Sequence, residues 1–284
     1  MNKCGTLTLA ILNWGLLTLL AQPVMADGPF PDKNLEAAVR ALIFDKKDNT
    51  KELTDEDLRK VFVLEAKGKG IKDLTGLEKC TNILLLNLAK NEVVDISMLK
   101  ALTNLQSLDL SQNKISDITP LAALTGLQFL ELSNNQVGSV EPLAKLTKLS
   151  ALYMANNKVS DIAPLAEVTR LSSLDLAKNE ISNLAPITKL TWLSLLKLSD
   201  NKIEDISPIP KKNQLKMLFL ERNKLSDLTP LVTASKEDAE GEKRFAPFLR
   251  LYLDGNPLSD SARTQQLEAL RSYGVRIESP SEKK

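Results

Sequence analysis

Leucines and other aliphatic residues recur along this chain in the pattern Leu-x-x-Leu-x-Leu-x-x-Asn-x-Ile/Val/Leu, with a period of 22 residues. The alternation in Leu-x-Leu predicts a short strand with one buried face, because successive side chains of a strand point to opposite sides. A fixed period of this length predicts one supersecondary unit that is stacked many times. The asparagines that mark the copies are Asn91, Asn113, Asn135, Asn157, Asn179, Asn201 and Asn223, and Asn256 follows after 33 residues.

A second spacing follows each asparagine. In one copy Ile118, Leu121 and Leu124 stand three residues apart, which favours a tight 3₁₀ or single-turn helical return. A strand and its return together fill the period, so the next strand pairs in parallel beside the first. No copy buries its leucines alone, and stability must come from stacking.

The repeated pattern resembles that of leucine-rich repeat proteins over about two-thirds of the chain. The segments Ser116–Leu121 and Ser160–Leu165, both Ser-Asp-Ile-x-Pro-Leu, resemble the internalin-type bacterial subfamily. This resemblance implies an α/β fold: a right-handed leucine-rich-repeat solenoid with a parallel sheet on the concave face, 3₁₀ or short-helix returns on the convex face, and helical caps at both ends. It also implies protein binding, without identifying the partner.

Polar residues and prolines recur at fixed positions of the repeat. We expect each asparagine side chain to pair with backbone groups of adjacent coils, since an unpaired buried group costs about 1–3 kcal/mol. Prolines suit the start of a return, where no amide donor is needed, and the aspartates before them are expected to cap it. A calcium ladder along the aspartates is the alternative, but Ser139 and Asn183 interrupt that column, so we expect no metal and no cofactor. The columns are Pro120, Pro142, Pro164, Pro186, Pro208 and Pro230, and Asp73, Asp95, Asp117, Asp161, Asp205 and Asp227.

The two ends of the chain differ from the repeats. Residues 1–26 combine Lys3, an apolar stretch and the sequence Val24-Met25-Ala26, which is the pattern of a secretory signal peptide. We therefore expect export, to the periplasm or as a secreted protein. The open ends of a stacked coil would expose leucines, so caps are required. We assign residues 27–62 to an N-terminal helical cap, 63–256 to the repeats, and 257–284 to a C-terminal capping helix and tail.

Both caps contain helix signals. Residues 34–42 form an amphipathic pattern with Asp32 as a cap residue, and Thr54 with Asp57 resembles a capping box. The front cap is similar to the N-terminal module of internalin-type proteins. At the other end, a helix is predicted to end near Gly274.

One departure breaks the period between Asn223 and Asn256, where 33 residues replace 22 and so add 11. The extra residues lie within about 232–247, and their core from Ser235 to Arg244 is highly charged. One interpretation is a solvated helical or looped elaboration of the last return. The other is a contact element for a partner, since insertions in repeat proteins commonly emerge on one face.

Composition argues against several classes of function. The formal net charge of +1 offers neither a basic field for nucleic acid nor a polybasic membrane patch. No histidine is present, which excludes Ser-His-Asp and Cys-His catalysis and histidine metal sites. Cys80, the one cysteine expected after signal cleavage, occupies a leucine column and is predicted to be buried. We expect no enzyme, no disulfide, no membrane span after signal cleavage, and a monomer.

The strand register predicts the outward face of the sheet. Residues that flank the central leucines point away from the core and form columns across the strands. Long apolar and aromatic side chains gather there, although only 4% of the chain is aromatic, and Asp109, Glu131 and Asp175 would surround Phe129 and Tyr153. The predicted partner-binding residues are Phe129, Glu131, Tyr153, Asp175, Leu195, Lys197, Met217, Phe219, Arg250 and Tyr252.

We expect this face to bind a protein or peptide, and its carboxylates suit a partner with basic residues near apolar anchors. Two alternatives stay open. The apolar side chains could simply pack on one another in an envelope scaffold with an unoccupied face, or the rings could stack on sugars in a carbohydrate-binding module. The sequence does not identify the partner.

Overall fold

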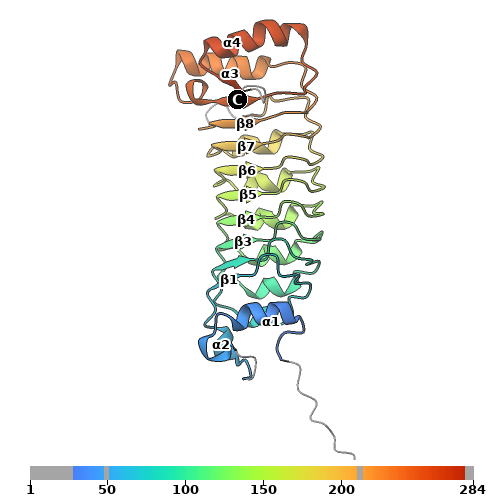
Figure 1. The fold of residues 1–284 in the computed structure, drawn as a ribbon. Coiled ribbons are helices and arrows are strands. Elements are labelled where there is room, and N and C mark those ends of the chain that lie inside the picture. Colours follow the sequence, from blue (N-terminus) through green and yellow to red (C-terminus); the bar gives the residue numbers. More distant parts are fainter. Residues whose placement is uncertain (1–27, 48–50, 210–213, 279–284) are drawn as a thin grey trace, which may run out of the picture.

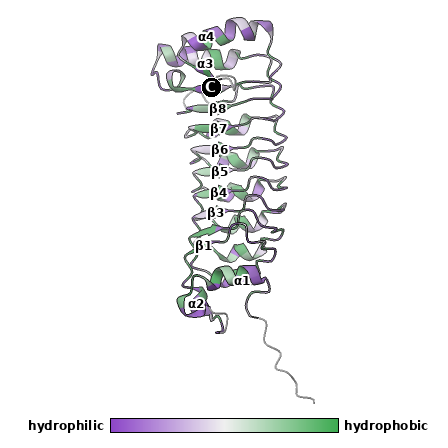
Figure 2. Cartoon of the chain, in the orientation of Figure 1, coloured by the Kyte–Doolittle hydropathy of each residue, from purple (hydrophilic) through white to green (hydrophobic). Residues whose placement is uncertain are grey.

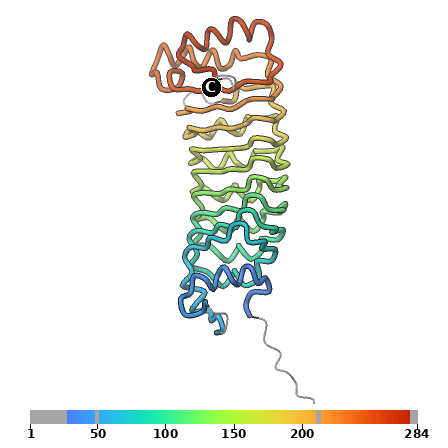
Figure 3. The backbone as a smooth tube through the Cα atoms, in the orientation of Figure 1, coloured from blue at the N-terminus to red at the C-terminus, as the bar shows by residue number. Residues whose placement is uncertain are grey.

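The computed structural model describes residues 28–47, 51–209 and 214–278, so the predicted signal peptide at residues 1–26 lies outside the described residues. The coils stack along one axis in sequence order, between helices at either end (Figures 1 and 3). One parallel sheet runs along the stack, and each strand pairs with the strand of the next coil. This arrangement confirms the predicted leucine-rich-repeat solenoid. The described strands are β1 (Val63–Glu65), β2 (Leu85–Asn87), β3 (Ser107–Asp109), β4 (Phe129–Glu131), β5 (Ala151–Tyr153), β6 (Ser173–Asp175), β7 (Leu195–Lys197), β8 (Met217–Phe219), β9 (Arg250–Tyr252) and β10 (Arg276–Glu278).

Short 3₁₀ helices form most of the returns, as the three-residue spacing predicted. The carboxylate of Asp117 accepts a hydrogen bond from the Thr119 amide at 2.8 Å, which closes an Asx turn where the return begins. Asn183 takes the place of the aspartate in its coil. Its Oδ1 accepts from the Ala185 amide, so the same turn is closed there. The 3₁₀ returns are η2 (Leu77–Lys79), η3 (Ser97–Ala101), η4 (Thr119–Ala123), η5 (Glu141–Lys145), η6 (Ala163–Glu167) and η7 (Ala185–Lys189).

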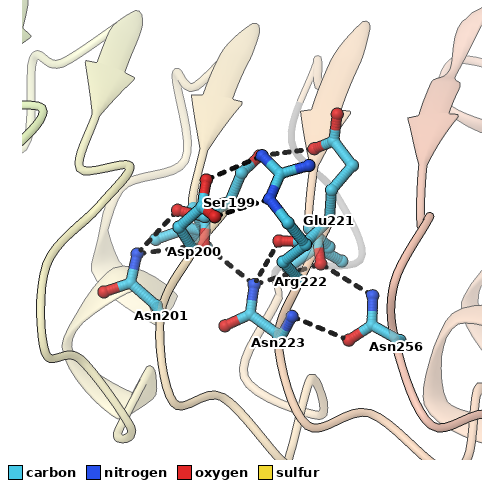
Figure 4. Close-up of polar contacts among 9 residues, drawn as sticks. Ser199, Asp200, Asn201, Glu221, Arg222, Asn223 and Asn256 are labelled. Carbon is cyan, nitrogen blue, oxygen red and sulfur yellow. Dashed lines mark hydrogen bonds and ion pairs between the residues drawn. The ribbon is translucent and has the colours of Figure 1, made fainter. Parts of the chain in front are cut away.

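Each repeated asparagine joins its own coil to the one before. The Asn179 Oδ1 atom accepts from the Val159 amide at 3.0 Å, and its Nδ2 donates to the carbonyls of Met154 at 2.9 Å and Leu176 at 3.0 Å. Asn256 does the same despite its longer spacing, because its Oδ1 accepts from the Leu225 amide at 3.2 Å; it also accepts from the Asn223 amide at 3.2 Å (Figure 4). The predicted structural role of the asparagines is therefore confirmed, and the extra residues leave the ladder intact.

The interior is aliphatic along the whole stack. The central leucines of the strands are buried, and the hydrophobic residues of the returns close the other side of the core. Cys80 occupies its predicted core position with no exposed surface, and burial raises the pKa of its thiol to about 12. Coloured by hydropathy, hydrophobic and hydrophilic residues alternate along the coils (Figure 2). Packing of one continuous core is what holds the coils together.

The N-terminal cap closes the first coil with the predicted helices. Helix α1 (Lys33–Arg40) begins after Asp32, whose carboxylate accepts from the amides of Asn34 and Leu35. The other oxygen of Asp32 accepts from the Lys72 amide at 2.7 Å, so one residue caps the helix and fastens it to the first return. Helix α2 (Asp55–Leu58) has the expected capping box of Thr54 and Asp57, and η1 (Phe44–Lys46) lies between the helices.

The longer return after Asn223 forms a helix, as one interpretation of the sequence predicted. Helix α3 (Thr229–Glu240) is followed by a turn in which Asp238 accepts from three backbone amides, one of them that of Phe245. The charged stretch is not solvated throughout, because Ser235 and Phe245 are buried. The short helix η8 (Ala246–Phe248) then leads into β9.

The C-terminal end contains one strand that the sequence did not predict. A π-helical turn, η9 (Ala262–Gln266), continues into α4 (Leu267–Ser272), and Gly274 ends the helix with a positive φ of 94°, as expected. The chain then forms β10, which pairs in parallel with β9 and extends the predicted sheet. In the described residues no helix is long and apolar enough to cross a membrane, and no cluster of three metal-ligating side chains occurs.

Candidate partner-binding surface

Two columns of outward side chains line the sheet, at the predicted positions. In β4 the central Leu130 is fully buried, so its neighbours Phe129 and Glu131 point to the opposite side. Pairing then places Glu131 between Asp109 and Tyr153. The predicted register is confirmed, and we call these two columns the sheet face. The first column is Val63, Leu85, Ser107, Phe129, Ala151, Ser173, Leu195, Met217, Arg250 and Arg276, and the second is Glu65, Asn87, Asp109, Glu131, Tyr153, Asp175, Lys197, Phe219, Tyr252 and Glu278.

Phe129 and Tyr153 form the N-terminal ring cluster of the sheet face. They come from the adjacent strands β4 and β5, and their ring centroids lie 5.6 Å apart with the planes inclined at 44°. A tilted pair at this distance is attractive beyond the area it buries. Both side chains are half-buried because each covers part of the other.

Three carboxylates accompany this ring cluster in the second column. Burial of Glu131 raises its pKa, and the nearby charges of Asp109 and Asp175 act in the same direction. The Ser133 amide donates to Glu131 at 2.7 Å and partly opposes this shift. Among the described residues no lysine or arginine forms an ion pair with Glu131. The cluster therefore combines an apolar ring pair with uncompensated negative charge.

Phe219 and Tyr252 form the C-terminal ring cluster. Their rings, from β8 and β9, stack with centroids 4.1 Å apart and planes only 6° from parallel. The ammonium of Lys197 lies 5.7 Å from the centroid of Phe219, within reach of a cation–π interaction. The same Nζ atom lies 3.1 Å from a carboxylate oxygen of Asp175, whose exposed fraction is 8%. Asp175 and Lys197 thus stand between the two ring clusters.

The remaining predicted residues belong to the first column. Leu195 and Met217 are paired neighbours on β7 and β8, and both are half-buried. Arg250 is exposed, and its Nε lies 2.7 Å from a carboxylate oxygen of Glu278 on β10. The guanidinium of Arg250 is therefore already paired, by a strand that the sequence analysis missed.

A polar network borders the sheet face where the chain leaves β7 and β8. Arg222 makes two hydrogen bonds to the Asp200 carboxylate, from Nε at 2.5 Å and from a terminal nitrogen at 2.7 Å (Figure 4). The hydrogen bonds from Arg222 lower the pKa of Asp200. Beside them, the Ser199 hydroxyl donates to Glu221. These contacts hold the ends of adjacent strands in place, next to the buried asparagine ladder.

The structure thus brings the predicted residues together as two ring clusters rather than one continuous patch. The rings pack on one another, as the first alternative held, yet they remain on the outward side of the sheet. Strand register did not predict the exposure of several large hydrophobic side chains, among them Phe44 at 84%, Trp192 at 63%, Phe248 at 59% and Phe62 at 52%. Trp192 follows a return and lies outside the alternating strand positions, which is why strand register alone did not find it.

A groove at the N-terminal end of the sheet face was also not predicted. It has a volume of about 460 Å³ and lies between α1 and β1, lined by Leu42, Val63, Glu65 and Lys69 among others. Val63 and Glu65 begin the two columns of the sheet face. Because Lys69 stands in place of the asparagine in this first coil, the repeat pattern is weaker around β1 than in the later coils.

Comparison with known proteins places these features in a family. A family model for leucine-rich repeats (2 copies) matches residues 81–123, 125–167 and 169–211. The crystal structure of internalin C2 from Listeria monocytogenes is 32% identical in sequence, with a TM-score of 0.58, over 68% of this chain and 94% of that one.

Two further structures from Listeria monocytogenes are similar to parts of this chain. An internalin, InlF, is 26% identical over 91% of this chain and 99% of its own, with a TM-score of 0.44. The functional domain of InlJ is 22% identical over 84% of this chain and 58% of its own, with a TM-score of 0.48. No curated protein sequence matches significantly. The identity to internalin C2, the family model and the repeat geometry together show that the chain belongs to the internalin-like leucine-rich repeat proteins of bacteria.

Proposed function

We propose that this protein is exported, catalyses no reaction, and binds a protein or peptide partner through the sheet face. The observation that carries the proposal is the position of the two ring clusters. The central residue of each strand from β1 to β9 is a buried leucine, whereas Phe129, Tyr153, Phe219 and Tyr252 all stand on the outward side. Partly exposed aromatic side chains on a rigid support are typical of residues that dominate binding energy at interfaces.

Rigidity of the sheet favours this use of the rings. Each strand is hydrogen-bonded to its neighbours, and the asparagine ladder fixes the turns that follow. The rings are further held by their own contacts at 5.6 Å and 4.1 Å. Little conformational freedom remains to be lost when a partner binds, so more of the contact energy contributes to affinity.

The charges on the sheet face favour a cationic partner. Five carboxylates stand in the second column, against Lys197 in the same column and Arg250 and Arg276 in the first. Lys197 is engaged by Asp175, which leaves Glu131 without a cation. A lysine or arginine of the partner, placed beside Tyr153, would meet both a ring and this carboxylate. The five carboxylates belong to Glu65, Asp109, Glu131, Asp175 and Glu278.

The test is affinity capture from cell envelope and medium fractions, followed by titration of the captured partner. Double replacement of Phe219 and Tyr252 by alanine, or of Phe129 and Tyr153, is expected to weaken binding at least about tenfold, as loss of a hot-spot residue does. Val94→Ala is the matched control, because Val94 is 56% exposed and stands in neither column. A partner that binds both double variants as tightly as the unmodified chain would exclude the sheet face.

Two further measurements separate the alternatives. The scaffold alternative predicts no saturable partner at all, whereas a carbohydrate-binding module predicts glycan binding that is lost on replacement of Tyr153 or Tyr252. Export is tested by fractionation and N-terminal sequencing, with a mature chain that begins near residue 27 as the expected result. A full-length chain found only in the cytosol would contradict export.

A further inference from the structure

A second surface lies outside the sheet face, on the edge where the chain comes out of each return and into a strand. Leu149, Leu171 and Leu193 are fully buried at the same position of three consecutive coils. The residues on either side of each leucine therefore lie on the outer side of this edge. We call the six of them the basic edge: Lys148, Arg170 and Trp192 before the leucines, and Ser150, Ser172 and Ser194 after them.

The cations of the basic edge are not paired within the protein. On the opposite edge, lysines pair with glutamates of the adjacent coil, as Lys114 does with Glu92 at 3.0 Å and Lys202 with Glu180 at 2.9 Å. Neither Lys148 nor Arg170 forms such a pair in the part of the chain that the structure describes. Both are exposed, so two free cations stand in line across adjacent coils.

Trp192 continues this line one coil further. Its side chain is 63% exposed, and it makes no ring contact with the described residues. A single exposed hydrophobic residue is ordinary, but this one follows two unpaired cations at the same position of the repeat. Adjacent strands are about 4.8 Å apart, so Lys148, Arg170 and Trp192 follow one another at nearly that spacing.

The three serines make the floor of this surface flat and polar. The Ser172 hydroxyl donates to the Ser150 carbonyl at 3.0 Å, and the Ser194 hydroxyl donates to the Ser172 carbonyl at 3.1 Å. Each hydroxyl oxygen keeps its lone pairs as acceptors for an outside donor.

We propose that the basic edge binds an acidic polysaccharide, with one uronate sugar beside each coil. The length of a pyranose unit is close to the ~4.8 Å spacing between strands. Successive sugars of a chain can therefore lie beside successive coils. Carboxylates of two sugars meet Arg170 and Lys148, the next ring stacks on the indole of Trp192, and sugar hydroxyls donate to the serines. An acidic peptide would supply the charges but not the flat hydroxylated ring.

The experiment uses the chain with Trp14→Phe, in which Trp192 is the only tryptophan. Tryptophan fluorescence is followed on titration with polygalacturonate oligomers, with fully methyl-esterified oligomers of the same length, and with polyglutamate. We expect a saturable change with polygalacturonate alone, weakened by salt. Arg170→Gln or Lys148→Gln should weaken it about tenfold, the effect of losing one charge-assisted hydrogen bond.

Lys158→Gln is the matched control, because Lys158 is also exposed and forms no close ion pair among the described residues, but lies on the opposite edge. If Lys158→Gln weakened polygalacturonate binding as much as Arg170→Gln does, only the net charge of the protein would matter, and the proposal would be wrong. Equal binding of polyglutamate would favour a peptide instead, and equal binding of the esterified oligomer would exclude the role of the cations. Sheet-face variants such as Phe219→Ala should leave this titration unchanged, so its result is independent of the proposed partner binding.

Discussion

The inward and outward sides of the same strands follow different rules, as β4, β5 and β6 show. Inward, the three strands carry leucine at the central position, and each is fully buried. Outward, the same strands carry two aromatic residues, Phe129 and Tyr153, and two acidic ones, Glu131 and Asp175. A close-packed core tolerates little change in volume, whereas outward positions vary without disturbing the stack. Residues one position apart can therefore differ in role: the inward ones stabilise the stack, and the outward ones are those that we propose for partner binding.

Two neighbouring replacements in β4 test whether the inward and outward positions differ in this way. Leu130→Ala removes a fully buried side chain, and we expect about 2–5 kcal/mol of lost stability from the lost burial and the cavity. Phe129→Ala removes a half-buried ring and one aromatic pair, for which we expect about 1 kcal/mol. Denaturant unfolding measures both. Equal losses at the two positions would show that Phe129 belongs to the core after all.

The asparagine ladder provides the next largest effect. Asn179→Ala leaves the Val159 amide and the carbonyls of Met154 and Leu176 without their side-chain partner, inside the stack. At about 1–3 kcal/mol for each buried unsatisfied group, a loss of about 3 kcal/mol or more is expected. Gln136→Ala, at an exposed position, is the control and should change stability by less than about 0.5 kcal/mol. A loss at Asn179 no larger than at Gln136 would contradict the ladder's role.

Much of this organisation was predictable because the repeat carries it many times. The period of two in Leu-x-Leu fixes which side chains point outward, so the sheet-face columns followed from the sequence and were confirmed. The pairing of rings did not follow, because register places Phe219 beside Tyr252 but does not decide their tilt or their contact with Lys197. Strand β10 escaped prediction because Arg276–Glu278 lacks the leucine alternation.

Ser235 is a polar exception among the buried residues. Its hydroxyl is fully buried in α3 and has no hydrogen-bond partner among the described residues. Ser235→Ala removes this unsatisfied group and places a better helix former there, so we expect a gain of about 1 kcal/mol. Thr233→Ala is the matched control in the same helix, because Thr233 is exposed. A loss of stability in Ser235→Ala would show that the hydroxyl is satisfied in solution.

Glu131 is the corresponding exception on the outward side, and its effect is the smallest. Burial, followed by repulsion from Asp109 and Asp175, raises its pKa above the ordinary 4.5. The folded state therefore holds this proton to higher pH than the unfolded state does, and the contribution of Glu131 to stability falls as pH rises through that window. Glu131→Gln keeps an acceptor for the Ser133 amide and removes the charge.

Relative to the unmodified chain, Glu131→Gln should gain stability as pH rises from 4.5 through the raised pKa, and the gain should then stay constant. Asp200→Asn is the control of opposite sign, since the hydrogen bonds from Arg222 lower the pKa of Asp200. That variant should be less stable than the unmodified chain at neutral pH and approach it below pH 3.8. Denaturant unfolding at a series of pH values measures both. A difference for Glu131→Gln that does not change with pH would mean that its carboxylate is solvated, and that the sheet face carries no buried charge for a cationic partner to meet.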